Sequence, residues 1–321
     1  MTRGERSTST GTRGDAPLWA ITCYFNPARF RRRLENYREF RRRLAAPLVT
    51  VELAFDGPFE LADDAAEIVI RVTGGSVLWQ KERLLNLAWP HVPPACRKIA
   101  WLDCDVFFEA DDWVDGAAAL LEDHALIVPF TRVAELRRGA SLGSAPSLAE
   151  CDVGVSLVDR WNRGERPDGI LSSNVRLART HSGLAWAARR ETVDGLGLYD
   201  ACVLGSGNRA MLCAAIGRPD DAIRYLCMGP AWAEHYRAWA SRYHARVGGR
   251  IGSLPTTIFH LWHGEIEARR YAERHRDLAR YGFAPATDVA AADGGPWVWA
   301  SDKPDMHAFV RRYFDARRED G

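Results

Sequence analysis

The stretch KIAWLDCDVFF, residues Lys98–Phe108, is an apolar run that two aspartates interrupt, Asp103 and Asp105. Side chains two apart in a strand point the same way, so both carboxylates project from one side of a strand end. Carboxylates placed in this way repel each other unless a cation or a proton lies between them. Carboxylate oxygens suit Mg²⁺ or Mn²⁺, and either ion also binds phosphates. The stretch therefore predicts a buried strand with a metal site at its end; the alternative is a pair of aspartates in a surface turn.

The chain before and after this stretch alternates short apolar runs with amphipathic ones. We expect strands at residues 18–25, 48–55, 66–72, 98–108 and 124–130. We expect helices at residues 30–44 and 74–89, and a further helix that Asp111 or Asp112 caps. Strands that alternate with helices indicate a mostly parallel sheet with helices on both faces, so the predicted fold class is α/β.

The second half of the chain is less regular. Residues 132–180 carry Gly, Ser and Pro without a sustained period, so we expect loops around a strand at residues 151–158. Residues 181–217 then contain an apolar stretch, a glycine-rich turn and a helix that opens at Asn208.

The last part of the chain begins with TTIFHLWHGE, which places His260 and His263 at the end of an apolar strand. The residues that follow predict two charged helical stretches around a loop that contains Trp297 and Trp299.

Composition limits the classes of function. The net charge of +1 gives no general attraction for nucleic acid or acidic membranes. Only three of the 43 basic residues are lysines, which we interpret as coding bias. The seven cysteines show no C-x-x-C spacing, so we expect neither a disulfide framework nor a zinc site. No apolar run reaches membrane-spanning length and the N-terminus lacks a signal-peptide pattern, which predicts a soluble, cytoplasmic protein.

The order of these features resembles that of GT-A glycosyltransferases, enzymes with a Rossmann-like nucleotide-sugar half and a D-x-D metal motif. The matching features are LWAITCYFNP, QKERLLN, the D-x-D, WAARRETVDGLGLYD and a histidine before Gly264. The resemblance covers roughly residues 17–265 and is to inverting family 2 and galactosyltransferase-like members.

These observations divide the chain into three parts. Residues 17–265, which the resemblance covers, are the expected catalytic domain. The polar residues 1–16 predict a disordered tail, and the charged helical stretches predict a helical C-terminal extension at residues 266–321. Within the catalytic domain, residues 17–130 form the nucleotide-sugar half and residues 131–265 the acceptor half.

The activity that the resemblance implies is transfer of a sugar, with inversion, from a nucleotide-sugar to a glycan or other hydroxyl acceptor. The expected donor is a UDP-sugar, and the expected cofactor is Mn²⁺ or Mg²⁺, because a metal that bridges phosphates stabilises the charge on the diphosphate leaving group. Asp105 is expected to bind the ion directly, and Asp103 to contact the ribose or metal-bound water. His263, beside Gly264, is expected to complete the metal site, with His260 as a second possible ligand.

Polar residues near the ends of the first two strands are candidates for nucleotide binding, because open α/β sheets bind ligands at the carboxyl ends of their strands. They are Thr22, Tyr24, Asn26, Glu52 and Asp56, each of which could equally be a turn or cap residue.

Three further side chains are candidates for substrate contacts. By resemblance, Lys81 and Arg83 pair with phosphate or with Asp103; the alternative is a solvated helix face. Trp186 could stack on an acceptor sugar, since apolar sugar faces suit aromatic surfaces, or could pack in the core.

The segment GSGNR departs from the family pattern. Inverting members carry the catalytic carboxylate in a G-G-E-D segment, whereas Gly207 and Asn208 stand here. An amide cannot accept a proton as a general base. Either Asn208 leaves the enzyme without its general base, or Asp200 reaches the acceptor and Asn208 caps the following helix.

Two other classes of function remain open. A sugar-nucleotide-binding relative that has lost catalysis would bind a donor without transferring its sugar. A phosphotransferase of the haloacid-dehalogenase type also has an apolar strand followed by D-x-D. Its nucleophile strand lies near the start of the fold and it needs a later lysine, whereas here several strands precede the motif and only Lys303 follows it.

Overall fold

The computed structural model describes residues 16–140, 146–166, 170–171, 179–271 and 273–321. The tail predicted at residues 1–16 therefore lies outside the described residues, except for Ala16. In the part of the chain that is described, no helix is both long and apolar enough to cross a membrane.

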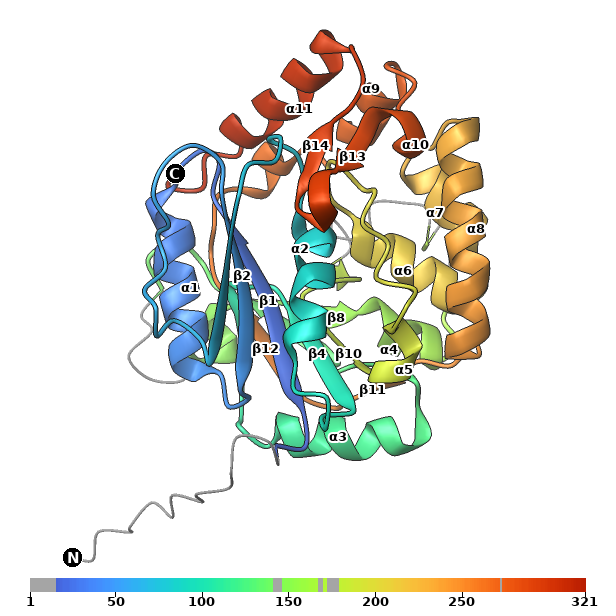
Figure 1. Ribbon diagram of the computed structural model, residues 1–321. Helices are drawn as coiled ribbons and strands as arrows, with labels where there is room; N and C mark the ends of the chain where they lie inside the picture. Colours follow the sequence, from blue (N-terminus) through green and yellow to red (C-terminus); the bar gives the residue numbers. More distant parts are fainter. Residues whose placement is uncertain (1–15, 141–145, 167–169, 172–178, 272) are drawn as a thin grey trace, which may run out of the picture.

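A mostly parallel sheet at the centre of the molecule confirms the predicted α/β class (Figure 1). Among its described strands, only β10 runs antiparallel to its neighbours. From edge to edge the strands are β11 (Gly252–Ser253), β6 (Leu126–Val128), β10 (Ala185–Arg189), β4 (Lys98–Leu102), β1 (Trp19–Phe25), β2 (Leu48–Ala54) and β3 (Ile68–Thr73).

Helices surround this sheet because each buries one apolar face. In α1 (Arg31–Arg43), Tyr37 and Phe40 are buried, whereas Arg31 and Arg42 are exposed and Arg33 is partly buried. The helix α2 (Lys81–Ala88) packs against β1 and β2 and lies in front of the sheet in Figure 1. The other helices before the C-terminal segment are α3 (Trp113–Asp123), α4 (Leu157–Asn162), α5 (Arg190–Val193), α6 (Gly207–Ala215), α7 (Pro219–Tyr225) and α8 (Pro230–Val247).

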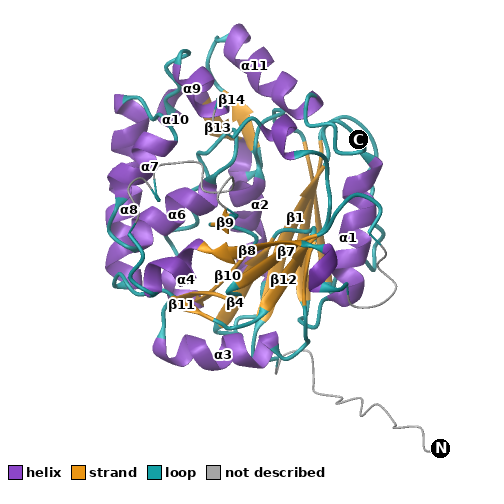
Figure 2. Ribbon diagram, turned by 180° about the vertical axis from the view of Figure 1, so that it is seen from behind, coloured by secondary structure: helices purple, strands orange, loops and turns teal. Residues whose placement is uncertain are grey.

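A second, smaller sheet lies on the face of the central sheet away from α2 (Figures 1 and 2). Its strand order is β5 (Val106–Phe108), β12 (Thr257–His260), β7 (Arg132–Glu135), β8 (Asp152–Ser156) and β9 (Thr180–His181). The strand expected at residues 151–158 is therefore present, as β8.

The single strand expected at residues 98–108 is in fact two strands in different sheets. The strand β4 ends at Leu102, and β5 begins at Val106 and pairs with β12. The turn between them is held by both sheets: the Asp103 N–H donates to the Leu184 carbonyl at 2.8 Å, and the Asp105 carbonyl accepts from the Leu261 N–H at 2.8 Å. The aspartates thus lie where the two sheets meet.

Two other expected elements differ from the structure. The helix expected from residue 74 begins at Lys81, because Gly74 and Gly75 have positive φ values of 79° and 83°, which a helix does not accommodate. The loop expected around Trp297 and Trp299 is strand β14 (Trp297–Trp299), which pairs with β13 (Val289–Ala291).

The C-terminal segment also contains α9 (Arg274–Ala279), α10 (Pro285–Asp288) and α11 (Pro304–Asp315). It packs back onto the carboxyl end of the central sheet, since Phe314 contacts Phe25 and stacks on Trp79 with ring centroids 6.3 Å apart. The last residues of the chain therefore lie close to the strand ends that carry the site.

Candidate functional site

A cavity of about 200 Å³ opens at the carboxyl ends of β1 and β4. Its wall is built from both sheets, from α2 and α6, and from the C-terminal segment. Of the residues proposed from the sequence, those that line it are Lys81, Asp103, Asp105, Asn208, His260 and His263.

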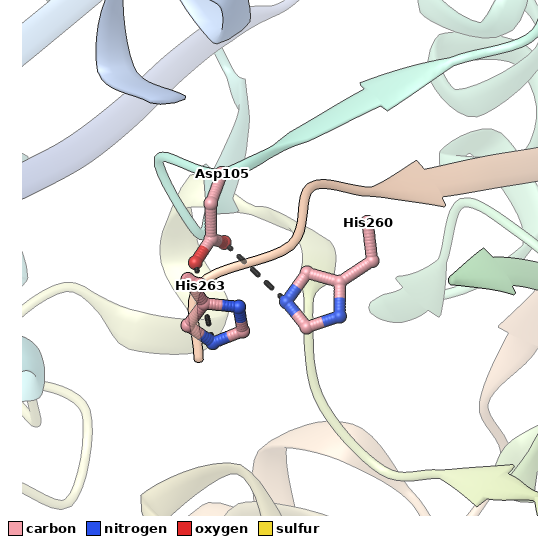
Figure 3. Close-up of side chains that lie close together, drawn as sticks. All are labelled: Asp105, His260 and His263. Atoms are coloured by element: carbon pink, nitrogen blue, oxygen red, sulfur yellow. Dashed lines mark ion pairs between the residues drawn. The ribbon is translucent and has the colours of Figure 1, made fainter. Parts of the chain in front are cut away.

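Asp105, His260 and His263 form a group that could hold a metal ion (Figure 3). One oxygen of Asp105, Oδ1, lies 3.8 Å from His260 Nε2, and the other, Oδ2, lies 3.7 Å from His263 Nε2. The ligand atoms all lie within 4.8 Å of one another. Asp105 comes from the turn after β4 and the histidines from the end of β12, so the meeting of the two sheets assembles the group.

The hydrogen bonds of both imidazoles favour metal binding. The Nδ1 atom of His260 lies 3.4 Å from Glu135 Oε1, and Nδ1 of His263 lies 3.0 Å from the Leu261 carbonyl oxygen. A carbonyl or carboxylate oxygen that accepts a hydrogen bond from Nδ1–H keeps the proton on Nδ1, and Nε2 is then free to bind a metal. The buried Oδ1 of Asp105 accepts no hydrogen bond from the described residues. The three residues therefore fit a cation with one oxygen and two nitrogen ligands.

The electrostatics of the group agree with this fit. Burial lowers the pKa of His260, but its interactions with Asp105 and Glu135 outweigh burial and raise that pKa to about 9. Burial raises the pKa of Asp105, but His260 and Arg33 outweigh it and hold that pKa below its usual range. Without a metal, a proton on His260 supplies the positive charge that a divalent cation would supply instead.

Asp103 lies in the same cavity but outside this group. Its Oδ1 atom accepts a hydrogen bond from Lys81 Nζ, and the Lys81 side chain is largely buried. Burial lowers the pKa of Lys81, but the carboxylates of Asp103 and Glu82 outweigh burial and hold that pKa above its usual range. The expected pairing of Lys81 with Asp103 is thus present, while a metal-ligand role for Asp103 remains a prediction.

A cluster of arginines that the sequence analysis did not identify lines the same cavity. Glu319, fully buried, accepts from Arg33 Nε at 2.6 Å, Arg269 Nη1 at 3.1 Å and Arg317 Nε at 2.5 Å. One carboxylate among three guanidinium groups leaves an excess of positive charge, which favours an anionic ligand. Because arginine is abundant along the chain, the sequence gives no reason to single out these residues.

A second cavity, of about 220 Å³, lies at the ends of β1 and β2 and is lined by Tyr24, Asn26, Glu52 and Asp56. Strand alternation separates the two cavities, because Tyr24 faces this one whereas its neighbours in β1 line the first. Thr22 lines neither cavity; it is fully buried and donates to the Leu102 carbonyl at 2.7 Å.

Two further candidates lie outside the first cavity. The carboxylate of Asp200 is held by Asn86 Nδ2 at 3.2 Å and lies 3.6 Å from Arg83 Nη1. Arg83 also donates through Nε to the Gly295 carbonyl at 2.8 Å, so it connects α2 to the C-terminal segment. Neither residue reaches the metal group in this arrangement.

Trp186 lies in the core. It is 1% exposed, pairs with Trp101 across β10 and β4, and stacks on it with centroids 6.4 Å apart. This placement corresponds to the core-packing alternative for Trp186.

Comparisons with known proteins find only distant similarity. No protein-family model matches the chain, and no curated protein matches it. The solved structure of TarS 1-349 from S. aureus shares 10% identity over 93% of this chain and 71% of that chain, with a TM-score of 0.36. The same TarS fragment in complex with UDP-GlcNAc shares 10% identity over 76% of this chain and 58% of that chain, with a TM-score of 0.37. Mannose-1-phosphate geranyltransferase from Thermus thermophilus shares 11% identity over 76% of this chain and 74% of that chain, with a TM-score of 0.25. At these scores the similarity assigns no family.

Proposed function

We propose that this chain is a metal-dependent glycosyltransferase that takes its sugar from a nucleoside-diphosphate sugar, with a UDP-sugar as the expected donor. The acceptor is a hydroxyl group, and the anomeric carbon is inverted. The observation that carries the proposal is a metal-binding group and an arginine cluster that open into one cavity. The residues concerned are Asp105, His260 and His263 for the metal, and Arg33, Arg269, Arg274 and Arg317 for the phosphates.

The expected ion is Mn²⁺, with Mg²⁺ as the alternative. The Asp105 carboxylate and the phosphate oxygens suit either ion, and the two imidazole nitrogens favour the transition metal over Mg²⁺. When bound, the ion supplies positive charge to the diphosphate. The arginines stabilise the same diphosphate charge, because a planar guanidinium group can donate two parallel hydrogen bonds to phosphate oxygens. Asp103, which accepts a hydrogen bond from Lys81, contacts the ribose or metal-bound water in this proposal.

The nucleotide base is assigned to the second cavity, at the ends of β1 and β2. Tyr24 offers an aromatic surface there, and Asn26 and Glu52 offer polar groups. Residues 17–130 then form the nucleotide-sugar half and residues 131–265 the acceptor half. The C-terminal extension, 266–321, contributes arginines to the phosphate site.

Two alternatives differ from this proposal in particular features. A phosphotransferase of the haloacid-dehalogenase type needs a lysine from after the motif, whereas Lys81, which pairs with Asp103, precedes it, and Lys303, the only later lysine, pairs with Asp288. A binding protein without catalysis is favoured by the amide of Asn208, and it is distinguished from an enzyme by turnover of a bound donor.

Thermal unfolding with UDP-, GDP- and CDP-sugars, each with and without Mn²⁺, tests the proposal. We expect one nucleotide class to stabilise the wild type only when Mn²⁺ is present, by about 2.7 kcal/mol at a hundredfold excess over its Kd. Asp105→Ala should lose this metal-dependent stabilisation and keep its fold. The exposed Asp111→Asn is the matched control and should behave as the wild type. Metal-dependent UDP binding that is unchanged in Asp105→Ala contradicts the site assignment.

A further inference from the structure

Three carboxylates line the first cavity among the described residues: Glu82, Asp103 and Asp105. Asp103 accepts a hydrogen bond from Lys81, and Asp105 lies between two imidazoles. The third, Glu82, belongs to neither the metal group nor an ion pair in the described part of the chain. Among these three carboxylates, Glu82 is therefore the one without a metal-binding or ion-pairing partner in the described residues.

The Glu82 carboxyl group lies against Gly207, which has no side chain to displace it. Glu82 lies in the first turn of α2 and is 2% exposed. A Cβ atom at Gly207 would fall 2.3 Å from Glu82 Oε1 and 2.4 Å from its Cδ. The carboxyl group thus occupies the space that a side chain at position 207 would fill.

The helix α6 begins at Gly207 after the N-cap Ser206, so Asn208 lies inside its first turn and does not cap it, contrary to the expectation from the sequence. Asn208 lines the same cavity. The Oδ1 atom of Asn208 is buried and accepts no hydrogen bond from the residues described. Since GSGNR itself carries no acid, the carboxyl group at this end of α6 comes from α2 instead.

We propose that Glu82 is the general base that deprotonates the acceptor hydroxyl, an inference that rests on the proposed function. The proton moves from the acceptor oxygen to the Glu82 carboxylate while that oxygen forms a bond to the anomeric carbon. The bond from the anomeric carbon to the phosphate oxygen breaks, and its electron pair leaves with the nucleoside diphosphate. A single displacement of this kind inverts the anomeric carbon.

The charges around Glu82 suit a base that works near neutral pH. Burial raises the pKa of Glu82 to about 7; Lys81 lowers it, and Asp103 and Asp200 raise it further. The thiols of Cys23 and Cys202 also interact electrostatically with Glu82. Burial holds both thiols protonated, because it raises each thiol pKa well above its usual range. General bases are most effective when their pKa lies near the working pH.

The test compares wild type, Glu82→Gln and Asp200→Asn. The probes are UDP-glucose, UDP-GlcNAc and GDP-mannose with Mn²⁺. The readouts are donor binding by calorimetry and the transfer of the sugar to water or to an added acceptor, measured as release of the nucleoside diphosphate. Water also loses a proton on attack, so an identified acceptor is not required. We expect Glu82→Gln to bind the donor as the wild type does and to turn over about 10²–10⁴-fold more slowly. The wild-type rate should rise with pH through the neutral range, and this rise should disappear in Glu82→Gln and persist in Asp200→Asn.

A Glu82→Gln variant as fast as the wild type, with the same pH profile, overturns the assignment of Glu82 and leaves the proposed function standing. A wild type that neither binds nor turns over any of the three donors overturns the proposed function itself. Gly207→Ala provides a second check, because its methyl group must displace the Glu82 carboxyl. It should slow the wild type strongly and should slow Glu82→Gln no further. Equal slowing in both backgrounds contradicts the role of Glu82.

Discussion

At the scale of single residues, two carboxyl groups in the cavity differ in protonation because their surroundings differ. Asp105 faces His260 and Arg33, which outweigh burial and lower its pKa. Glu82 is buried without comparable compensation, so its pKa rises to about 7. At neutral pH Asp105 is thus charged, whereas Glu82 is near its midpoint and can both accept and release a proton.

The raised pKa of Glu82 predicts a pH-dependent effect on stability. An acid whose pKa is higher in the folded state than in the unfolded state contributes stability at low pH, and this contribution is lost as pH rises from about 4.5 through about 7. Glu82→Gln removes the titration. Relative to the wild type, the variant should therefore gain stability between pH 5 and pH 8, by up to roughly 3 kcal/mol. Urea unfolding of both proteins, without nucleotide, at the two pH values measures this gain. A difference that stays constant with pH contradicts a raised Glu82 pKa.

At the scale of elements, the site depends on the contact between β4 and β10. These antiparallel strands place Trp101 opposite Trp186, and the two rings stack in the core. Trp101 lies only two residues before Asp103, where the turn that carries the aspartates begins. The position of this turn therefore depends on packing in the core below it.

Trp186→Ala tests the structural role of this stack. Removing a buried Trp side chain leaves a cavity, so the free energy of unfolding should fall by about 3–5 kcal/mol. Trp186→Phe, which keeps an aromatic ring, should lose much less and should still bind nucleotide with Mn²⁺. Chemical denaturation gives both values. Normal stability of Trp186→Ala combined with a raised acceptor KM would instead favour the acceptor-stacking role.

At the scale of the whole molecule, a residue that follows the first strand and a residue close to the C-terminus meet at the site. Arg33 follows β1, and Glu319 lies 286 residues later, close to the C-terminus. Arg269 Nη2 also donates to the His263 carbonyl, so the arginine cluster contacts the backbone of a proposed metal ligand. The phosphate site and the metal site are therefore parts of one connected arrangement.

Glu319→Gln should separate the structural and binding roles of this cluster. Losing the buried carboxylate leaves three guanidinium groups facing one another, so the variant should lose about 3 kcal/mol of stability without ligand. A bound diphosphate supplies the missing negative charge. The stabilisation by UDP and Mn²⁺ should therefore be larger in Glu319→Gln than in the wild type. Thermal unfolding measures both effects, with the exposed Asp315→Asn as control. Equal UDP stabilisation in variant and wild type contradicts a phosphate role for the arginines.

Local sequence patterns were sufficient to predict most elements of the first half of the central sheet. Apolar runs of strand length and amphipathic periods identify β1, α1, β2, β3 and β6, because the apolar pattern of each of these elements lies within its own residues. The same reasoning failed at residues 98–108, because the apolar residues on both sides of Asp103 and Asp105 were assigned to one strand. In the structure the two aspartates lie in a turn, and the apolar residues belong to two strands in different sheets.

The sequence by itself determined that acidic and imidazole side chains end two apolar strands, because residue type and strand alternation are local properties. Only the tertiary structure decided that Asp105 rather than Asp103 faces the histidines, that Glu82 lies against Gly207, and that Glu319 gathers three arginines. Each of these contacts joins elements far apart in the chain. Such contacts depend on how two sheets and a C-terminal segment pack together, and packing between distant elements leaves no periodic signal in the sequence.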